Sequence, residues 1–323
     1  MSLYNIYNKK HQAGYSIESY NPHHRLLEVR MSQLFIRQFT DADTGPADEL
    51  LNLAFHTSAS RAHDLAIYRQ LQPDGWFAAE QGRRLVGMVG AIHYGDFAHV
   101  GLMAVHPEAQ RQGFGMALMQ FILAWIETYS RAGQQPPASW LDASLMGRPL
   151  YEKLGYTSYD ETGIYVRPIN PAAPLPGGYL QKHRIQALTP HELDELAPLD
   201  RAVFGADRRK VLQALLKVYP QRAFLQRDEA GQIAGYLIAQ KNRIGPWVML
   251  QPGQAEALLQ TALSLPYEGT LAVNPSSKNK EISELLARHG FEWSRANQHM
   301  GWRVSQLHGQ RQQVFSQASL ALG

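Results

Sequence analysis

The chain contains no cysteine among its 323 residues. It therefore has no disulfide bond, no cysteine nucleophile and no thiolate metal site. Long runs of Lys and Arg are also absent, and the formal net charge is only +3, so charge does not indicate nucleic-acid binding. The pair His23-His24 has no partners at ligand spacing, and no metal site is predicted.

Long apolar runs are missing as well. No run reaches the length of a membrane span, and the N-terminus has no apolar signal core. Hydrophobic residues make up 45% of the chain and charged residues 18%, which is typical of a soluble globular protein. We therefore expect a cytoplasmic protein without a membrane partner, long enough for two domains of about 150 residues each.

One stretch changes from strand-like to helix-like across two glycines. Residues 98–105 form an apolar run of strand type, and apolar residues recur at helical spacing from Phe114 to Tyr129. Between them lies a short polar loop that contains Gly113, with Gly115 just beyond it. Glycines let a backbone come close to a ligand, and the free N–H groups and positive dipole end of a helix N-terminus suit a phosphate.

A second motif follows after one more predicted strand, which spans residues 139–143. Residues 144–156 predict a helix that ends at Gly155, and its last part reads Leu-Tyr-Glu-Lys-Leu-Gly-Tyr over residues 150–156.

The two motifs together resemble the GNAT superfamily of N-acetyltransferases. The spacing Gln110-x-x-Gly113-x-Gly115 is similar to the family's pyrophosphate loop, and residues 150–156 are similar to its Leu-Tyr-Glu-Lys-Leu-Gly-Phe helix end. The resemblance covers residues 34–167. Two positions depart from it, because Ser144 stands for an Asn seven residues before the Tyr, and Gly147 stands for the usual Ala.

This resemblance implies an acetyl-CoA site. The pantetheine arm and the acetyl carbonyl are expected on the backbone of Met103, Ala104 and Val105, with Ser144 replacing part of the Asn contact. Tyr151 matches the usual general acid, which protonates the sulfur of CoA; the alternative is a Tyr that only packs the helix on the sheet. The residues expected around the pyrophosphate are Gln110, Arg111, Gln112, Gly113, Phe114, Gly115 and Met116.

Transfer to an amine also needs a base. An amine with a pKa near 10.4 is protonated at pH 7, and removing the proton costs roughly 4.6 kcal/mol. His99 matches the position of the catalytic Glu in the histone-acetylating branch, and a neutral imidazole accepts a proton near pH 7. The alternative is a His with a structural hydrogen bond. Glu80, His93 and Asp96 compete for the role, and Asp142 is a candidate for orienting a partner or the amine.

The order of predicted elements repeats in the second half of the chain. The predicted order is a strand, a helix capped by Thr189, a hairpin, a further strand, and then two helices separated by a strand. The last helix ends at Gly290. This copy lacks the phosphate pattern, with only Gly253 in the loop, and Leu286 stands where the Tyr would be. We expect five segments: a flexible extension (1–30), a catalytic GNAT domain (31–168), a Pro/Gly-rich linker (169–182), a divergent GNAT-like domain (183–306) and a tail (307–323).

The sequence thus predicts an α/β protein of the GNAT fold (α+β), with two tandem domains that each have a mixed, mostly antiparallel sheet flanked by helices. Its expected activity is acetyl transfer from acetyl-CoA to a primary amine of a small molecule, peptide or protein by direct attack. The alternative is an acetyl-CoA-binding regulatory or scaffold module without transfer activity. The expected partners are acetyl-CoA and the amine; a homodimer is left open.

Overall fold

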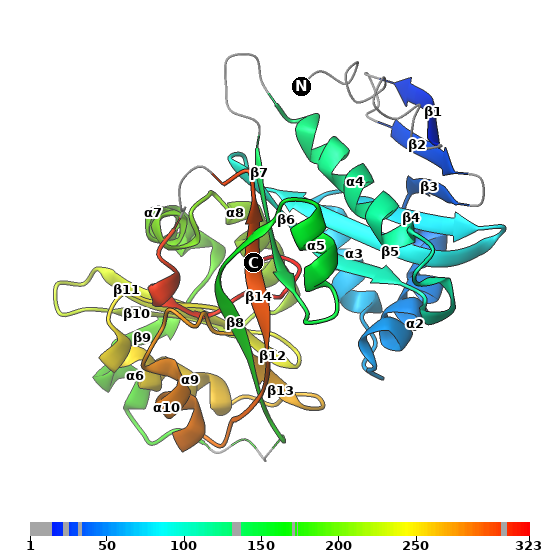
Figure 1. Ribbon diagram of the computed structural model, residues 1–323. Coiled ribbons are helices and arrows are strands. Elements are labelled where there is room, and N and C mark those ends of the chain that lie inside the picture. Colours follow the sequence, from blue (N-terminus) through cyan, green and yellow to red (C-terminus); the bar gives the residue numbers. More distant parts are fainter. Residues whose placement is uncertain are drawn as a thin grey trace. The chain divides into compact units, whose positions relative to one another are not determined.

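The computed structural model of the chain describes residues 15–21, 26–31, 34–130, 137–169, 172, 174–304 and 309–323. Its contacts divide it into two compact units. Unit 1 comprises Met1–His93 and Ala98–Ser139, and unit 2 comprises Tyr94–Phe97 and Trp140–Gly323. Figure 1 labels helices α2–α10 and strands β1–β14.

Unit 1 is built on an antiparallel sheet in which strands follow one another in chain order. The strands are β1 (Tyr15–Asn21), β2 (Leu26–Met31), β3 (Phe35–Gln38), β4 (Trp76–Gln81), β5 (Arg84–His93) and β6 (Phe97–Val105). Helices α2 (Thr44–Phe55) and α4 (Phe114–Glu127) pack against β5, and α3 (Ala62–Leu71) packs against α2. The core is aromatic where Phe77 of β4 meets the rings of Phe121 and Trp125 of α4 at 4.8 and 6.2 Å.

The N-terminal segment differs from its expectation. The sequence predicts a flexible extension over residues 1–30, whereas the structure forms β1 and β2 there and pairs β2 with β3 through Val29↔Ile36 and Arg30↔Phe35. Apolar and polar residues alternate toward the end of Leu26–Met31, which is a strand pattern. The polar residues around this segment make the pattern hard to detect.

Unit 2 has a mixed sheet. Its order is β7-β14-β8-β13-β12-β11-β10-β9, and β15 pairs with β12 outside this path. The β12–β13 pair is parallel. The pairs β8–β13, β8–β14, β9–β10, β10–β11 and β11–β12 are antiparallel. The strands are β7 (Ala138–Ala143), β8 (Thr157–Arg167), β9 (Ile185–Ala187), β10 (Ala223–Arg227), β11 (Ile233–Ala239), β12 (Arg243–Met249), β13 (Leu271–Val273), β14 (Glu292–Trp302) and β15 (Val314–Ser316).

The helices of unit 2 complete a repeat. They are α5 (Arg148–Lys153), α6 (Tyr179–Lys182), α7 (Leu193–Phe204), α8 (Arg209–Val218), α9 (Ala255–Leu263) and α10 (Ile282–Arg288). The order strand, two helices, three strands, helix, strand, helix, strand runs from β3 to β8 and again from β9 to β14. This finding confirms the predicted tandem repeat. Among the described residues, no helix combines the length and the apolarity needed to cross a membrane.

The last strands of the two repeats pair with each other. In the sheet of unit 2, β14 lies beside β8 from Glu292↔Val166 to Gly301↔Thr157, and β8 in turn pairs with β13 (Figure 1). The contact boundary therefore falls between Ser139 and Trp140, whereas the sequence places it in the Pro/Gly-rich linker at 169–182. A local pattern predicts that β8 is a strand, but it does not say which repeat supplies its partners.

The C-terminal segment is a further departure. The sequence assigns residues 307–323 to a tail, yet Val314–Ser316 form β15, and Phe315, Ala318 and Leu322 are buried. The Gln-rich composition conceals this short apolar segment, and burial of apolar surface holds it in the core of unit 2.

Candidate functional site

The strand β6 contains a β-bulge. Met88 and Gly90 of β5 pair with Ala104 and Gly101, so two residues of β6, Leu102 and Met103, lie opposite one residue of β5. Leu102 has a φ of +50°, a left-handed conformation that costs of order 1–3 kcal/mol outside glycine. A bulge interrupts the regular β5–β6 ladder at this point.

The loop after β6 is held by its own side chains. Gln110 Nε2 donates to the carbonyl of Val105 at 3.2 Å, and Gln112 Nε2 donates to the carbonyl of Glu108 at 3.2 Å. The loop reaches the helix through Gly113, whose φ of +85° is left-handed. The side chains of Gln110 and Gln112 thus bond to the backbone of the loop and shape it.

Helix α4 begins at Phe114 without an acidic residue in its first turn. The N–H groups of Phe114, Gly115 and Met116 lie in that turn, where an α-helix has no carbonyl of its own to receive them. Together with the positive end of the helix dipole they suit an anion. Arg111 is exposed in the loop. The loop's one acidic side chain, Glu108, is engaged by Arg84 at 2.9 Å, whose hydrogen bond and charge lower the pKa of Glu108.

Tyr151 lies on α5 in unit 2, where only 8% of the residue is exposed. Burial raises the pKa of its hydroxyl to about 12, so Tyr151 holds its proton at pH 7. A Cβ at Gly147 would lie 3.0 Å from Cε2 of this ring and 3.5 Å from its hydroxyl. Glycine therefore gives Tyr151 room where the family has an alanine. Ser144 is exposed, and its Oγ accepts a hydrogen bond from the N–H of Gly147 at 3.2 Å.

The candidates for the base lie in different surroundings. His99 is on β6 opposite Ile92 and is 1% exposed. Glu80 accepts a hydrogen bond from Arg37 Nε at 3.1 Å, and the ring of His93 stacks on Tyr129 at 4.0 Å. Asp96 is exposed in the turn between β5 and β6. Glu80 and His93 are thus engaged in contacts within unit 1.

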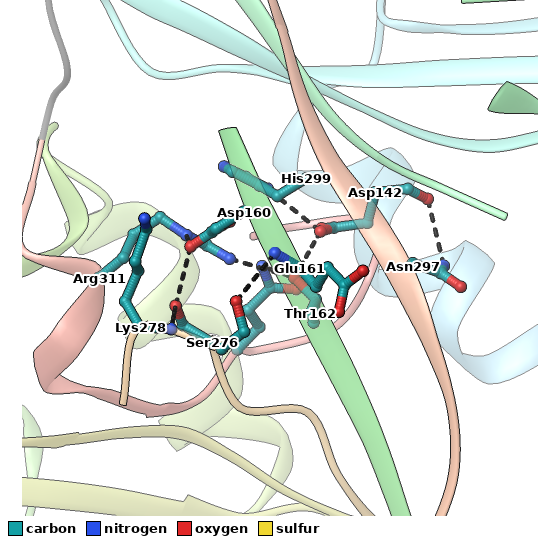
Figure 2. Close-up of polar contacts among 11 residues, drawn as sticks. Asp142, Asp160, Glu161, Thr162, Ser276, Lys278, Asn297, His299 and Arg311 are labelled. Atoms are coloured by element: carbon teal, nitrogen blue, oxygen red, sulfur yellow. Dashed lines mark hydrogen bonds and ion pairs between the residues drawn. The ribbon is translucent and has the colours of Figure 1, made fainter. Parts of the chain in front are cut away.

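Unit 2 holds a polar cluster that sequence analysis missed, apart from Asp142. In Figure 2 the imidazole of His299 on β14 points at the carboxylate of Asp142 on β7, with 3.1 Å between Nδ1 and Oδ1. The hydroxyl of Thr162 donates to the same oxygen at 2.6 Å, and the ring of His299 stacks on Trp140 at 4.8 Å. Asp142 and His299 are 157 positions apart, and no local signal joins them.

An ion pair between Arg311 and Asp160 completes this cluster. Arg311 Nε donates to Asp160 at 2.7 Å, and Ser276 Oγ donates to the same carboxylate oxygen at 3.0 Å. Thr162 Oγ1 also accepts from Arg311 at 3.1 Å and from Gln317 at 3.2 Å. The hydroxyl thereby uses its single donor and both acceptor positions, and it connects the His299–Asp142 hydrogen bond to the Arg311–Asp160 ion pair.

The cluster keeps His299 uncharged. Burial lowers the pKa of His299, and the positive charge of Arg311 lowers it further against the opposing effect of Asp142. A neutral imidazole beside a carboxylate donates from Nδ1, so Asp142 fixes the tautomer of the ring. Among the residues that the structure describes, no group of three or more His, Asp or Glu side chains has the arrangement of a metal site.

Comparison with known families agrees with the repeat. Residues 72–158 and residues 196–316 each match an acetyltransferase (GNAT) domain, and the two matches together span more than half of the chain. The chain belongs to the GNAT family of acetyltransferases, with two GNAT domains in tandem. Membership places it among the N-acetyltransferases, as the two sequence motifs predict.

Individual relatives support the same fold. The uncharacterised N-acetyltransferase YitH of Bacillus subtilis is 23% identical over 211 residues, which cover 64% of this chain and 70% of YitH. A candidate acetyltransferase from Pyrococcus horikoshii superposes with a TM-score of 0.75 at 23% identity, covering 91% of this chain and 97% of that one. A tandem GNAT protein from the clavulanic acid biosynthesis pathway has a TM-score of 0.56 at 15% identity, covering 84% and 98%.

The buried neutral His299 makes stability depend on pH. Its pKa in the folded protein lies below the value of about 6.5 in an unfolded chain, so unfolding takes up a proton between these two values. The contribution of the neutral His299 to the free energy of unfolding is therefore fully present above about pH 6.5. This contribution is lost as the pH falls toward the pKa of His299 in the folded protein. Urea unfolding at pH 7.5, 6.5 and 5.5 is expected to show this decline.

The variant His299→Gln is expected to flatten that decline, because glutamine takes up no proton on unfolding. The matched control is His191→Gln, which removes a solvent-exposed histidine and is expected to keep the wild-type slope. An unchanged slope in His299→Gln would contradict the assignment of a neutral buried imidazole.

Proposed function

We propose that the chain is an acetyl-CoA-dependent N-acetyltransferase whose first GNAT copy binds the cofactor. The proposal rests above all on one continuous segment. A bulged strand, a loop with a left-handed glycine and a helix start without acidic residues follow one another from Gly101 to Met116. The proposed acceptor is a primary amine of a small molecule, peptide or protein, and the proposed setting is the cytoplasm.

The pyrophosphate is assigned to the start of α4. In this proposal the backbone N–H groups of the loop and first helical turn bind the phosphate oxygens, and the guanidinium of Arg111 adds positive charge. Because Arg84 engages Glu108, the carboxylate of the loop is partly compensated. The residues assigned to the pyrophosphate are Gln110, Arg111, Gln112, Gly113, Phe114, Gly115 and Met116.

The pantetheine arm is assigned to the bulged part of β6. Its amide groups would pair with the backbone of Met103, Ala104 and Val105 as an added strand does. A backbone N–H at the bulge would then stabilise negative charge on the thioester oxygen during attack. Ser144 is assigned a polar contact to the same arm through its exposed hydroxyl.

The transfer is proposed to proceed by direct attack. His99 takes a proton from the ammonium group, and the neutral nitrogen forms a bond to the carbonyl carbon of the thioester. The tetrahedral intermediate then expels the CoA sulfur, which receives the proton of Tyr151, and the second proton that the nitrogen loses as the amide forms restores the Tyr151 hydroxyl. The pKa of about 12 keeps the Tyr151 hydroxyl protonated at pH 7, as a proton donor must be before the sulfur departs.

One observation favours the second candidate, an acetyl-CoA-binding module without transfer activity. His99 is 1% exposed, a position also typical of a structural histidine. The binding module and the enzyme share the same cofactor site, so they differ only in whether an amine is acetylated.

The cofactor assignment predicts that acetyl-CoA stabilises the protein. At a ligand concentration of 100 times Kd the gain is about 2.7 kcal/mol, which corresponds to a rise in Tm of several degrees. Gly115→Asp places a negative charge in the first turn of α4, and we expect it to weaken acetyl-CoA binding at least about tenfold by repulsion. Differential scanning fluorimetry measures both effects.

Gly115→Asn is the matched control, because it adds a side chain of the same size without the charge. It is expected to retain more of the thermal shift than Gly115→Asp. A wild-type protein whose Tm does not respond to acetyl-CoA would disprove the cofactor assignment, and equal losses in both variants would disprove its electrostatic basis.

The catalytic assignment predicts two separable defects. Tyr151→Phe is expected to lower kcat by about 10²-fold with little change in the Kd for CoA, since the hydroxyl acts on the departing sulfur. His99→Gln is expected to lower kcat similarly and to remove the decline of the rate at acidic pH. Release of the CoA thiol across a panel of primary amines measures both.

Tyr156→Phe serves as the control, because this ring lies edge-to-face with Tyr151 at 5.9 Å and has no catalytic assignment. An unchanged kcat in Tyr151→Phe would remove Tyr151 as the acid, and an unchanged pH profile in His99→Gln would remove His99 as the base. Silence of the wild type with every amine, together with acetyl-CoA binding, would favour the binding module.

A further inference from the structure

The second repeat contains a counterpart of the cofactor strand. Gly87 of β5 pairs with Val105 of β6, and Gly235 of β11 pairs with Met249 of β12. Counting back from these pairs, Trp247 and Val248 occupy the positions of Met103 and Ala104. The β11–β12 ladder also has a register shift, between Leu237 and Ala239. The second copy therefore keeps the bulged strand of the first.

A different segment of the chain pairs with this counterpart strand. The neighbouring strand β13 pairs with β12 only at Arg243 and Ile244. Farther along β12, β15 pairs antiparallel with it, through Trp247↔Ser316 and Val248↔Val314. Two of the three backbone positions that correspond to the proposed pantetheine positions, Trp247 and Val248, are thus paired with residues 314–316 of the same chain.

The occupying segment is bonded on both of its sides. The N–H of Gln317 donates to the carbonyl of Asn274 at 2.9 Å, just beyond β13, and Ser316 Oγ accepts from the N–H of Asn274 at 2.9 Å. On the other side, Gln240 Nε2 donates to the carbonyl of Ala318 at 2.7 Å. The segment therefore closes the space between β12 and the chain that follows β13.

Packing leaves no room for a second occupant there. Phe315 is 0% exposed and its ring lies 5.0 Å from that of Trp247. Gly245 approaches the segment so closely that a Cβ would lie 2.0 Å from the carbonyl oxygen of Gln317. Close contact of backbone with backbone at this glycine is what a built-in peptide ligand requires.

The phosphate side of the second copy has also changed. The connection from β12 to α9 is residues 250–254, and it lacks the Gln-x-x-Gly-x-Gly pattern. Helix α9 carries Glu256 in its first turn, where α4 has no acidic residue. Glu256 pairs with His289 at 2.8 Å and with Arg288 at 3.4 Å, so a carboxylate already lies at this helix start.

We propose that residues 314–318 are the permanent ligand of the second GNAT copy. This copy binds an extended peptide strand of its own chain in place of an acyl-CoA, and the whole protein binds one acyl-CoA. The comparison of these β12 positions with a pantetheine site rests on the function proposed for the first copy. The pairing of residues 314–318 with β12 and its surroundings rests on the contacts above.

Calorimetric titration of the full chain with CoA tests the stoichiometry. We expect one CoA per chain, and we expect Gly115→Asp in the first copy to weaken that site at least tenfold without revealing another. Two CoA molecules per wild-type chain, or a second site of unchanged affinity in Gly115→Asp, would overturn the proposal while leaving the proposed function intact. Binding of no CoA would instead contradict the proposed function, and the next measurement would then decide about the occupancy alone.

Amide hydrogen exchange of the full chain, followed by mass spectrometry, tests the occupancy without any ligand. Residues 243–249 and 314–318 are expected to exchange over hours, as a buried ladder does. In Phe315→Ala, exchange of residues 243–249 is expected to be at least tenfold faster, whereas that of residues 97–105 in β6 stays unchanged. The control Gln312→Ala alters an exposed side chain and is expected to behave as the wild type.

Exchange of residues 314–318 within seconds in the wild type would overturn the proposal. It would mean that the segment is a solvent-exposed tail. Unchanged exchange of residues 243–249 in a folded Phe315→Ala would overturn it as well. If Phe315→Ala does not fold, the wild-type measurement still decides.

Discussion

Backbone N–H and C=O groups inside a protein need hydrogen-bond partners, and this requirement shapes both GNAT copies. Each copy has a strand, β6 or β12, whose ladder to the preceding strand is shifted by a bulge. In the second copy the chain itself supplies the partner, since β15 pairs with Trp247 and Val248. In the first copy we assign the equivalent groups of Met103 to Val105 to pantetheine. One architectural requirement would thus be met by a cosubstrate in one repeat and by a peptide in the other.

Charge at two helix starts follows the same division. Helix α4 opens without an acidic residue, and Arg84 engages Glu108 in the loop before it. Helix α9 opens with Glu256 in its first turn. Because a carboxylate and a phosphate compete for the same positive helix end, this single difference favours anion binding at the first copy. The polar cluster around Thr162 joins β7, β8 and β14 through Asp142, Thr162 and His299.

Local patterns predicted the architecture well. The turn glycines Gly113, Gly155 and Gly290 all have a positive φ, the first at a helix start and the others at helix ends. The predicted elements occur in the predicted order in both repeats, but α8 and β14 of the second repeat were not predicted. The bulge at Leu102 was not predictable, because one additional residue within an apolar run changes no pattern. Pairing partners were not predictable either: Asp142 and His299, or β12 and β15, are brought together only by the folded sheet. The short apolar segment of β15 was concealed by the glutamines around it.

The central claim is that one acetyl-CoA binds along β6 with its pyrophosphate at the start of α4. A crystal structure of the protein with acetyl-CoA tests this most directly. The account predicts density for the pantetheine beside Met103 to Val105 and for the pyrophosphate within hydrogen-bond distance of the N–H groups of residues 113–116. Cofactor density at α9, or along β12 in place of residues 314–318, would contradict it.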